Sequence, residues 1–153
     1  MGQNPRRRCS SRQAICYHLR MEDSSGRADL EAIRRAAQAT PGLDLLMVFG
    51  SRARGDAHVR SDWDFGYLAG PSADVSALLA ALVEATRSDR VDLVDLRRAS
   101  GVLRFHAARD GQVLHEQPPG AGDEFRLEAA HFWCDMAPIL ERGHQAVLAG
   151  LHP

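Results

Sequence analysis

The sequence contains no lysine, so all 19 of its basic residues are arginines. This absence excludes Schiff-base chemistry, which needs a lysine amine, and it excludes the lysine that clamps phosphate in a Walker A loop. Gly50 and Gly55 have the spacing of the glycines in that loop. However, Asp56 and Ala57 stand where Lys and Ser or Thr are required.

Cysteine is scarce, and long apolar runs are lacking. The three cysteines, Cys9, Cys16 and Cys134, have no CxxC spacing and are odd in number. Reduced thiols in a cytoplasmic protein are the simplest explanation. No apolar stretch has the roughly 20 residues that a membrane-spanning helix needs, so we expect no membrane partner.

The 153 residues fit one domain with enough apolar content for its own core. We expect a disordered basic extension over residues 1–26, a folded core over residues 27–116, and a linker with a C-terminal helix over residues 117–153. Residues 1–21 carry five arginines and no acid, and no apolar region follows them, so a secretory signal is not expected. A nucleic-acid-binding arm is the alternative for this segment, and nucleic acid is otherwise not an expected partner.

A Gly-Ser pair follows a predicted buried strand. Leu43–Phe49 is a short apolar run with a glycine on either side, which is typical of such a strand. Gly50 lets the backbone turn tightly and approach a ligand closely. Ser51 is expected to be the N-cap of a short helical turn that ends at Gly55.

Amide groups at the start of a helix bind anions, so Gly50 and Ser51 are predicted to contact phosphate. Arg52 and Arg54 follow in the same turn and could add positive charge to this contact. Salt bridges on the helix surface are the alternative for the two arginines.

Two aspartates follow about ten residues later, separated by one residue. The segment Asp62–Leu68 alternates as a strand does, which places Asp62 and Asp64 on one face and directs Trp63 and Phe65 into the core. Two carboxylates this close repel each other unless a cation lies between them. Mg²⁺ prefers one or two carboxylates together with phosphate oxygens. A phosphate-binding turn combined with this pair therefore suggests chemistry on a nucleoside triphosphate.

A third acid is expected from the next strand, Arg90–Leu96. Asp92 and Asp95 are three residues apart, so in a regular strand they face opposite sides and only one can join the pair. We favour Asp92 because it lies mid-strand between apolar neighbours, and Asp95 remains the alternative.

These motifs resemble the minimal nucleotidyltransferases of the DNA-polymerase-β-like superfamily. The resemblance covers about residues 28–116 and implies an α/β (α+β) fold, in which helices pack on a small mixed β-sheet and a C-terminal helix follows. It implies that ATP is the substrate and Mg²⁺ the cofactor. The residues that match the family's catalytic and metal-binding positions are Asp62, Asp64 and Asp92, and those at its nucleotide-binding turn are Gly50, Ser51, Arg52 and Arg54.

The segment from Arg126 to Pro138 looks like the C-terminal helix of the antitoxin members of this superfamily, which pair with HEPN-type ribonuclease toxins. This resemblance implies AMPylation, the transfer of AMP from ATP to a tyrosine of the toxin. Two alternatives remain open: a small-molecule nucleotidyltransferase of the aminoglycoside-modifying kind, and an antitoxin that neutralises its partner by binding alone.

The remaining segments are predicted to form the scaffold around these motifs. Helices are expected over Arg27–Ala39 and Ala73–Arg87, the second with Ser72 as its N-cap. A turn at Arg109–Gly111 should lead into an edge strand over Gln112–His115. Pro138 should kink or restart the last helix.

Overall fold

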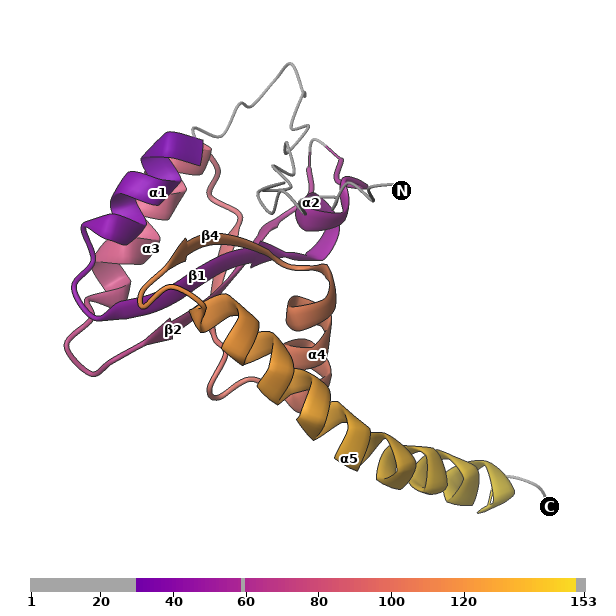
Figure 1. The fold of residues 1–153 in the computed structure, drawn as a ribbon. Coiled ribbons are helices and arrows are strands. Elements are labelled where there is room, and N and C mark those ends of the chain that lie inside the picture. Colours follow the sequence, from indigo (N-terminus) through magenta and orange to yellow (C-terminus); the bar gives the residue numbers. More distant parts are fainter. Residues whose placement is uncertain (1–29, 59, 151–153) are drawn as a thin grey trace, which may run out of the picture.

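A computed structural model of the protein describes residues 30–58 and 60–150. The predicted extension over residues 1–26, with Cys9 and Cys16, lies outside this part of the chain. The described elements, shown in Figure 1, are α1 (Leu30–Gln38), β1 (Leu43–Phe49), α2 (Gly50–Arg54), β2 (Trp63–Ala69), α3 (Val75–Thr86), β3 (Val91–Asp95), α4 (Gly101–Asp110), β4 (Gln112–Glu116) and α5 (Ala121–Gly150).

The strands form one mixed sheet in the order β3-β2-β1-β4. β1 pairs antiparallel with both β2 and β4, whereas β2 and β3 are parallel. The parallel pair is possible because α3 connects β2 to β3 and returns the chain to the same end of the sheet. The mixed α/β architecture implied by the resemblance is confirmed, and Gln112–His115 is part of an edge strand as expected.

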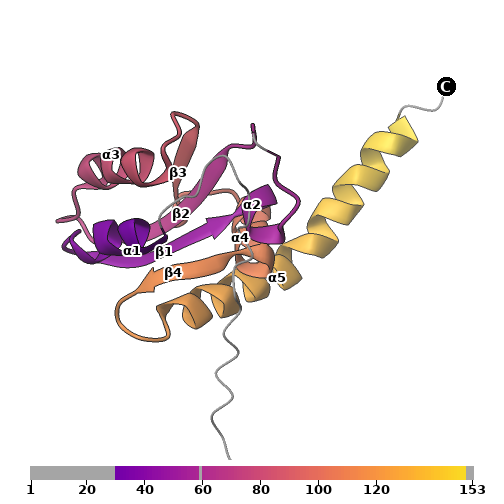
Figure 2. The ribbon, with the colours of Figure 1, turned by 90° about the horizontal axis from the view of Figure 1, so that it is seen from above.

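Helices cover both faces of the sheet, with α1 and α3 on one side and α4 and α5 on the other (Figure 2). β1 is central, so its side chains are buried on both faces, which explains its nearly continuous apolar sequence. Leu46 and Val48 belong to the core under α1 and α3, together with Trp63 and Phe65 of β2. The opposite core, formed with α4 and α5, contains Leu45, Met47, Phe49, Leu96, Ala107 and Phe125.

The start of α3 differs from the prediction. Asp74, and not Ser72, is the N-cap, because its Oδ1 accepts a hydrogen bond from the N–H of Ala77 at 2.9 Å. Ser72 lies in the turn before this position.

The prediction of a turn at Arg109–Gly111 is wrong. Asp110 is the last residue of α4, and the N–H of Gly111 still bonds to the carbonyl oxygen of Ala107 at 2.9 Å. Ser100 caps the start of this helix by accepting a bond from the N–H of Leu103. The Asp-Gly pair therefore ends a helix, and it does not join two strands.

The C-terminal helix α5 continues through Pro138. Of the two outcomes predicted there, a kink or a restart, the restart is wrong and the kink stays a prediction. Pro138 is exposed, and the carbonyl group left without its helical partner can be hydrated. The first half of α5 packs on α4, where the Trp133 ring stacks on Phe105 with centroids 4.5 Å apart. None of the helices in the described part is both long and apolar enough to span a bilayer.

Candidate active site

The site is organised around the turn at which β1 ends. Gly50 has a φ of +71°, a left-handed value, and α2 begins at this residue. The N-cap is Phe49 in an extended conformation, so the prediction that Ser51 caps the helix is wrong; Ser51 lies inside the first turn. Within residues 30–58 and 60–150, no side chain caps this helix start, and its first amide groups are therefore suited to an external anion. Gly55 ends α2 in a left-handed conformation, as expected.

Asp64 lies directly beside this turn. It pairs with Phe49 in the antiparallel register of β1 and β2. A Cβ atom placed on Gly50 would overlap the carboxylate of Asp64. Glycine is thus required at position 50 both by the backbone conformation and by the closeness of this side chain.

Asp92 of β3 lies opposite Asp64 of β2 in the parallel register. Neighbouring residues in register point to the same face of a sheet, so the two carboxylates share a face. Asp95 instead lies opposite Tyr67. Burial raises the pKa of Tyr67, and the charge of Asp95 raises it further. The structure therefore brings Asp92 to Asp64, and it places Asp95 farther along the strand beside Tyr67.

Asp62 is located one residue before β2 and not inside it, because the strand begins at Trp63. Its side chain is 57% exposed and lies 3.7 Å from the Nε of Arg90. Trp63 is 2% exposed and Phe65 is fully buried, so the predicted direction of both aromatic side chains is confirmed. The Trp63 N–H donates to the carbonyl oxygen of Arg90 at 2.9 Å, which joins the start of β2 to the start of β3.

Asp92 and Asp62 are both within electrostatic reach of Asp64. Burial raises the pKa of Asp64, and the charges of Asp92 and Asp62 raise it further. The positive charges of Arg54 and Arg52 act in the opposite direction but do not cancel the rise. The negative charge on Asp64 is therefore disfavoured by its surroundings, and a bound cation would relieve this repulsion.

The carboxylates near the Gly50 turn can be compared with the ligands that Mg²⁺ prefers. Within the described ranges, no three His, Cys, Asp or Glu side chains are close enough together to hold one metal ion. Mg²⁺, however, is commonly bound by one or two carboxylates, with water and phosphate oxygens completing its coordination. Asp62 and Asp64 meet this smaller requirement, and the like-charge repulsion on Asp64 favours a cation at this position.

The two arginines of α2 have different surroundings. The Arg54 side chain is exposed, and its Nε donates to Oδ2 of Asp56 at 3.2 Å. Arg52 is directed to the main chain before β2, where its Nη2 donates to the carbonyl oxygen of Ser61 at 2.6 Å. The exposed Arg54 side chain can therefore reach a bound phosphate more easily than the Arg52 side chain can.

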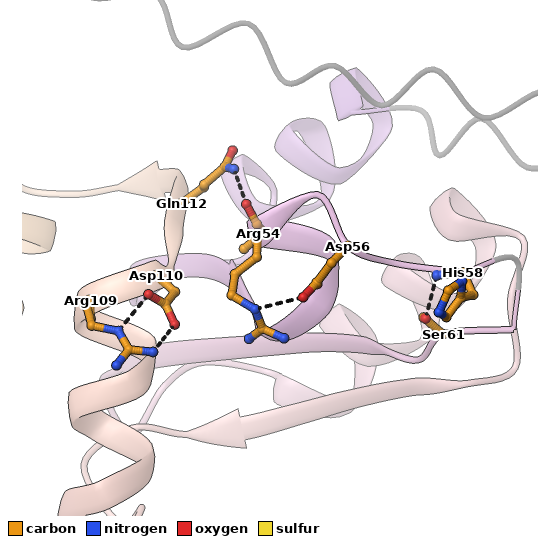
Figure 3. A network of polar contacts seen from close by, with 8 residues as sticks. Arg54, Asp56, His58, Ser61, Arg109, Asp110 and Gln112 are labelled. Atoms are coloured by element: carbon orange, nitrogen blue, oxygen red, sulfur yellow. Dashed lines mark hydrogen bonds and ion pairs between the residues drawn. The ribbon is translucent and has the colours of Figure 1, made fainter.

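Further polar groups surround Arg54, as Figure 3 shows. Gln112 of β4 donates from Nε2 to the carbonyl oxygen of Ala53 at 2.8 Å, which fastens α2 to the edge strand. Arg109 donates two hydrogen bonds to Asp110, at 2.7 and 2.6 Å. These bonds hold the pKa of Asp110 below its ordinary value, and the charge of Arg54 acts in the same direction. Arg54 therefore has both acidic and basic side chains near it.

Sequence reasoning missed Arg90, Asp110 and Gln112. Arg90 could have been found once β2 and β3 were known to be parallel, because the pairing of Trp63 with Val91 brings the preceding residues of the two strands together. Gln112 and Asp110 carry no such signal. Their positions depend on how α4 and β4 pack against α2.

Comparison with known proteins adds an independent observation. Residues 31–119 match the protein family described as "Polymerase beta, Nucleotidyltransferase". A curated relative from Aphanizomenon flos-aquae (strain 2012/KM1/D3), named protein adenylyltransferase MntA, is 36% identical over 97 residues. The aligned part is 56% of this chain and 63% of the relative, so the chain spans less than two thirds of that protein's length.

Solved structures show the same likeness. A crystal structure of a toxin-antitoxin with AMP-PNP contains a chain with a TM-score of 0.60 and 29% identity, covering 76% of this chain and 98% of that one. A complex of a tri-AMPylated Shewanella oneidensis HEPN toxin with an MNT antitoxin contains a chain with a TM-score of 0.50 and 27% identity. That match covers 75% of this chain and 92% of the other.

Proposed function

Because this chain belongs to the polymerase-beta nucleotidyltransferase family, we propose that it transfers AMP from ATP to a tyrosine hydroxyl of a HEPN-type toxin and thereby acts as an antitoxin. The name of the adenylyltransferase relative and the toxin-antitoxin structures support the acceptor. The structure containing AMP-PNP supports an adenine nucleotide as the donor. ATP as the donor, together with the exposed free thiol of Cys134, supports a cytoplasmic location.

One observation carries the proposal: the carboxylate of Asp64 touches the Gly50 turn and faces Asp92 across the parallel strands. A reaction on a triphosphate requires acidic side chains close to an anion-binding turn. The turn receives phosphate, while the acids hold the cation that neutralises it.

In the proposed reaction, Gly50 and Ser51 lie against the triphosphate, and Arg54 adds positive charge near its terminal phosphates. Asp62 and Asp64 would hold Mg²⁺, which would offset the negative charge that develops at the α-phosphorus. The glycine at position 50 keeps the turn close enough to Asp64 for both groups to act on one ligand.

The chemical step is an exchange of one P–O bond for another. The tyrosine oxygen forms a bond to the α-phosphorus, and the bond from the α-phosphorus to the oxygen bridging to the β-phosphorus breaks. Pyrophosphate leaves with the electron pair of that bond. Asp92 accepts the proton from the attacking hydroxyl, which makes it the general base.

The experiment is to incubate the purified chain and its toxin partner with ATP and Mg²⁺ and to weigh the partner by intact mass spectrometry. We expect a gain of one or more AMP groups on the partner and none with the double variant Asp62→Asn/Asp64→Asn. A chain that binds ATP and Mg²⁺ but leaves the partner unmodified would contradict the protein acceptor and favour the small-molecule nucleotidyltransferase.

Neutralisation by contact alone is the second candidate, and α5 is the observation that favours it. The C-terminal half of this helix extends away from the sheet (Figure 2). In the first half, Leu127 and Phe132 are exposed and present apolar surface. The same double variant separates the two functions. If it still inhibits the ribonuclease partner fully without modifying it, binding is sufficient and the enzymatic proposal is contradicted as the basis of antitoxin action.

A further inference from the structure

The Arg52 side chain joins α2 to two residues that lie nine and ten positions later in the sequence. Its backbone belongs to α2, directly after the Gly50 turn, and its side chain reaches the main chain that leads into β2. The Nε donates to the carbonyl oxygen of Asp62 at 3.2 Å, and the Nη2 donates to that of Ser61 at 2.6 Å. Two consecutive carbonyl groups thus bind one guanidinium group.

The aromatic side chain of Trp63 supports this guanidinium from one side. The Cζ of Arg52 lies 4.2 Å from the centroid of the Trp63 ring. The ring is itself buried and stacks on Phe65, with centroids 5.6 Å apart and planes within 4° of parallel. The guanidinium therefore rests on a rigid part of the core, and it is fixed by both stacking and hydrogen bonding.

These contacts hold the main chain that carries the Asp62 carboxylate. Asp62 precedes β2, so the ladder of the sheet does not hold its main chain directly. Its exposed side chain has an ion pair with Arg90 at 3.7 Å, which is a weak restraint in water. The main-chain bond from Arg52 consequently supplies a firm connection between Asp62 and the turn at Gly50.

Arg54, two residues farther along α2, differs from Arg52 in each of these respects. It is exposed, its Nε contacts the Asp56 side chain, and it reaches no main-chain group before β2 in the contacts described. The two residues carry the same charge on the same short helix, which makes Arg54 a matched control for Arg52.

We infer that Arg52 is a positioning residue for the Asp62 carboxylate: seated on Trp63, it clamps the Ser61–Asp62 main chain to α2, and it does not bind the triphosphate. The inference rests on the proposed function for its catalytic consequence. It assigns the phosphate contact to Arg54, so it separates two residues that the sequence motif presents as equivalent.

The inference requires an arginine at this position and not merely a positive charge. Lysine has one compact charged group that cannot bind two carbonyl oxygens in a fixed fork or stack flat on an indole ring. We therefore expect Arg52→Lys to behave like Arg52→Gln. A phosphate-binding arginine would behave differently, because lysine also binds phosphate as a point charge.

The first test is amide hydrogen exchange of the metal-free chain. We expect Arg52→Lys to accelerate exchange at the Trp63 amide about tenfold or more, because the segment before β2 loses its clamp. Exchange in β1 should be unchanged in this variant, and Arg54→Lys should leave the Trp63 amide at its original rate. Unchanged exchange at Trp63 in Arg52→Lys would overturn the inference, whether or not the chain is an enzyme.

The second test is calorimetric titration of ATP into each variant with and without Mg²⁺. Loss of a group that orients a metal ligand typically weakens metal binding about 10–100-fold. We expect Arg52→Lys and Arg52→Gln to retain metal-free affinity for ATP and to lose about tenfold in the presence of Mg²⁺. Weaker binding by Arg52→Gln under both conditions, with Arg52→Lys unaffected, would instead identify a phosphate contact and overturn the inference.

A measurement on the unaltered chain covers the case in which a variant fails to fold. The side-chain Nε–H signals of Arg52 and Arg54 can be followed by NMR as ATP and Mg²⁺ are added. We expect the Arg54 signal to shift and the Arg52 signal to stay in place; a large shift at Arg52 would overturn the inference. If the unaltered chain binds no ATP at all, the proposed function fails, while the exchange test still decides the role of Arg52.

Discussion

Asp64 and Asp92 lie directly opposite each other on the parallel strands β2 and β3, with their side chains on the same face of the sheet. The proximity of the two negative charges contributes to the raised pKa of Asp64. Unfavourable electrostatics of this kind are typical of sites that bind a cation or move a proton.

The two acids of β3 should differ in their effect on catalysis. We expect Asp92→Asn to lower kcat about 100-fold or more, because a general base typically contributes this much. Asp95→Asn should leave kcat within a few-fold of the original value, since Asp95 lies beside Tyr67 and not beside Asp64. Steady-state kinetics of AMP transfer would measure both. Equal losses in the two variants would show that the register of β3 does not select the catalytic acid.

Gly50→Ala should destabilise the chain and inactivate it. Alanine at a left-handed φ costs about 1–2 kcal/mol, and its Cβ would displace the Asp64 carboxylate as well. Gly55→Ala is the matched control, because Gly55 has a φ of +80° and no atom of the described part of the chain lies within 4 Å of an added Cβ.

Urea unfolding and AMP transfer separate the two contributions at these glycines. Gly55→Ala should show the backbone cost with activity largely retained, whereas Gly50→Ala should lose both stability and activity. Full activity in Gly50→Ala would mean that close contact between the turn and Asp64 is not needed.

Asp64 should make the metal-free chain less stable as the pH rises. Its pKa in the folded state lies above the ordinary value of 3.8, so the folded chain binds this proton more tightly than the unfolded chain does. The resulting stabilisation is complete below pH 3.8 and is lost as the pH rises through the folded-state pKa.

We therefore expect Asp64→Asn to melt at a higher temperature than the original chain at pH 7 without metal. The gap should close as the pH falls towards 4, and melting curves over this range would measure it. A variant that melts at a lower temperature at pH 7 would contradict the electrostatic description of the site.

Two phenylalanines of α5 should separate folding from partner binding. Phe125 is 1% exposed, and Phe125→Ala should cost about 3–5 kcal/mol of unfolding free energy. Phe132 is 41% exposed, so Phe132→Ala should cost only about 1 kcal/mol of unfolding free energy. Relative to this small loss of stability, it should weaken partner binding more than Phe125→Ala does. Unfolding in denaturant and titration of the partner measure the two effects. Unchanged partner binding by Phe132→Ala would restrict the role of this residue to packing on α4.

Local signals in the sequence predicted the central strand and its turn. The apolar run Leu43–Phe49 is a strand with those bounds, and Gly55 ends the short helix after it. The directions of Trp63 and Phe65 followed from strand alternation alone. These features depend on short-range sequence patterns, which is why they could be identified without a structure.

The errors have different causes. The caps predicted at Ser51 and Ser72 are wrong, because Phe49 and Asp74 occupy the N-cap positions. Phe49 is the last residue of β1, whereas Asp74 caps α3 through a local bond to the N–H of Ala77. The difference between Arg52 and Arg54 depends on where the chain returns before β2, which no spacing rule contains. The roles of Asp62, Asp64 and Asp92 as metal ligands and catalytic groups remain predictions.

The most direct measurement of the central claim is a crystal structure of the chain with a non-hydrolysable ATP analogue and Mn²⁺, which replaces Mg²⁺ and can be located by anomalous scattering. We predict an anomalous peak within about 2.2 Å of carboxylate oxygens from both Asp62 and Asp64, with the triphosphate against Gly50 and Ser51. A peak held by other residues, or a triphosphate away from this turn, would contradict the account.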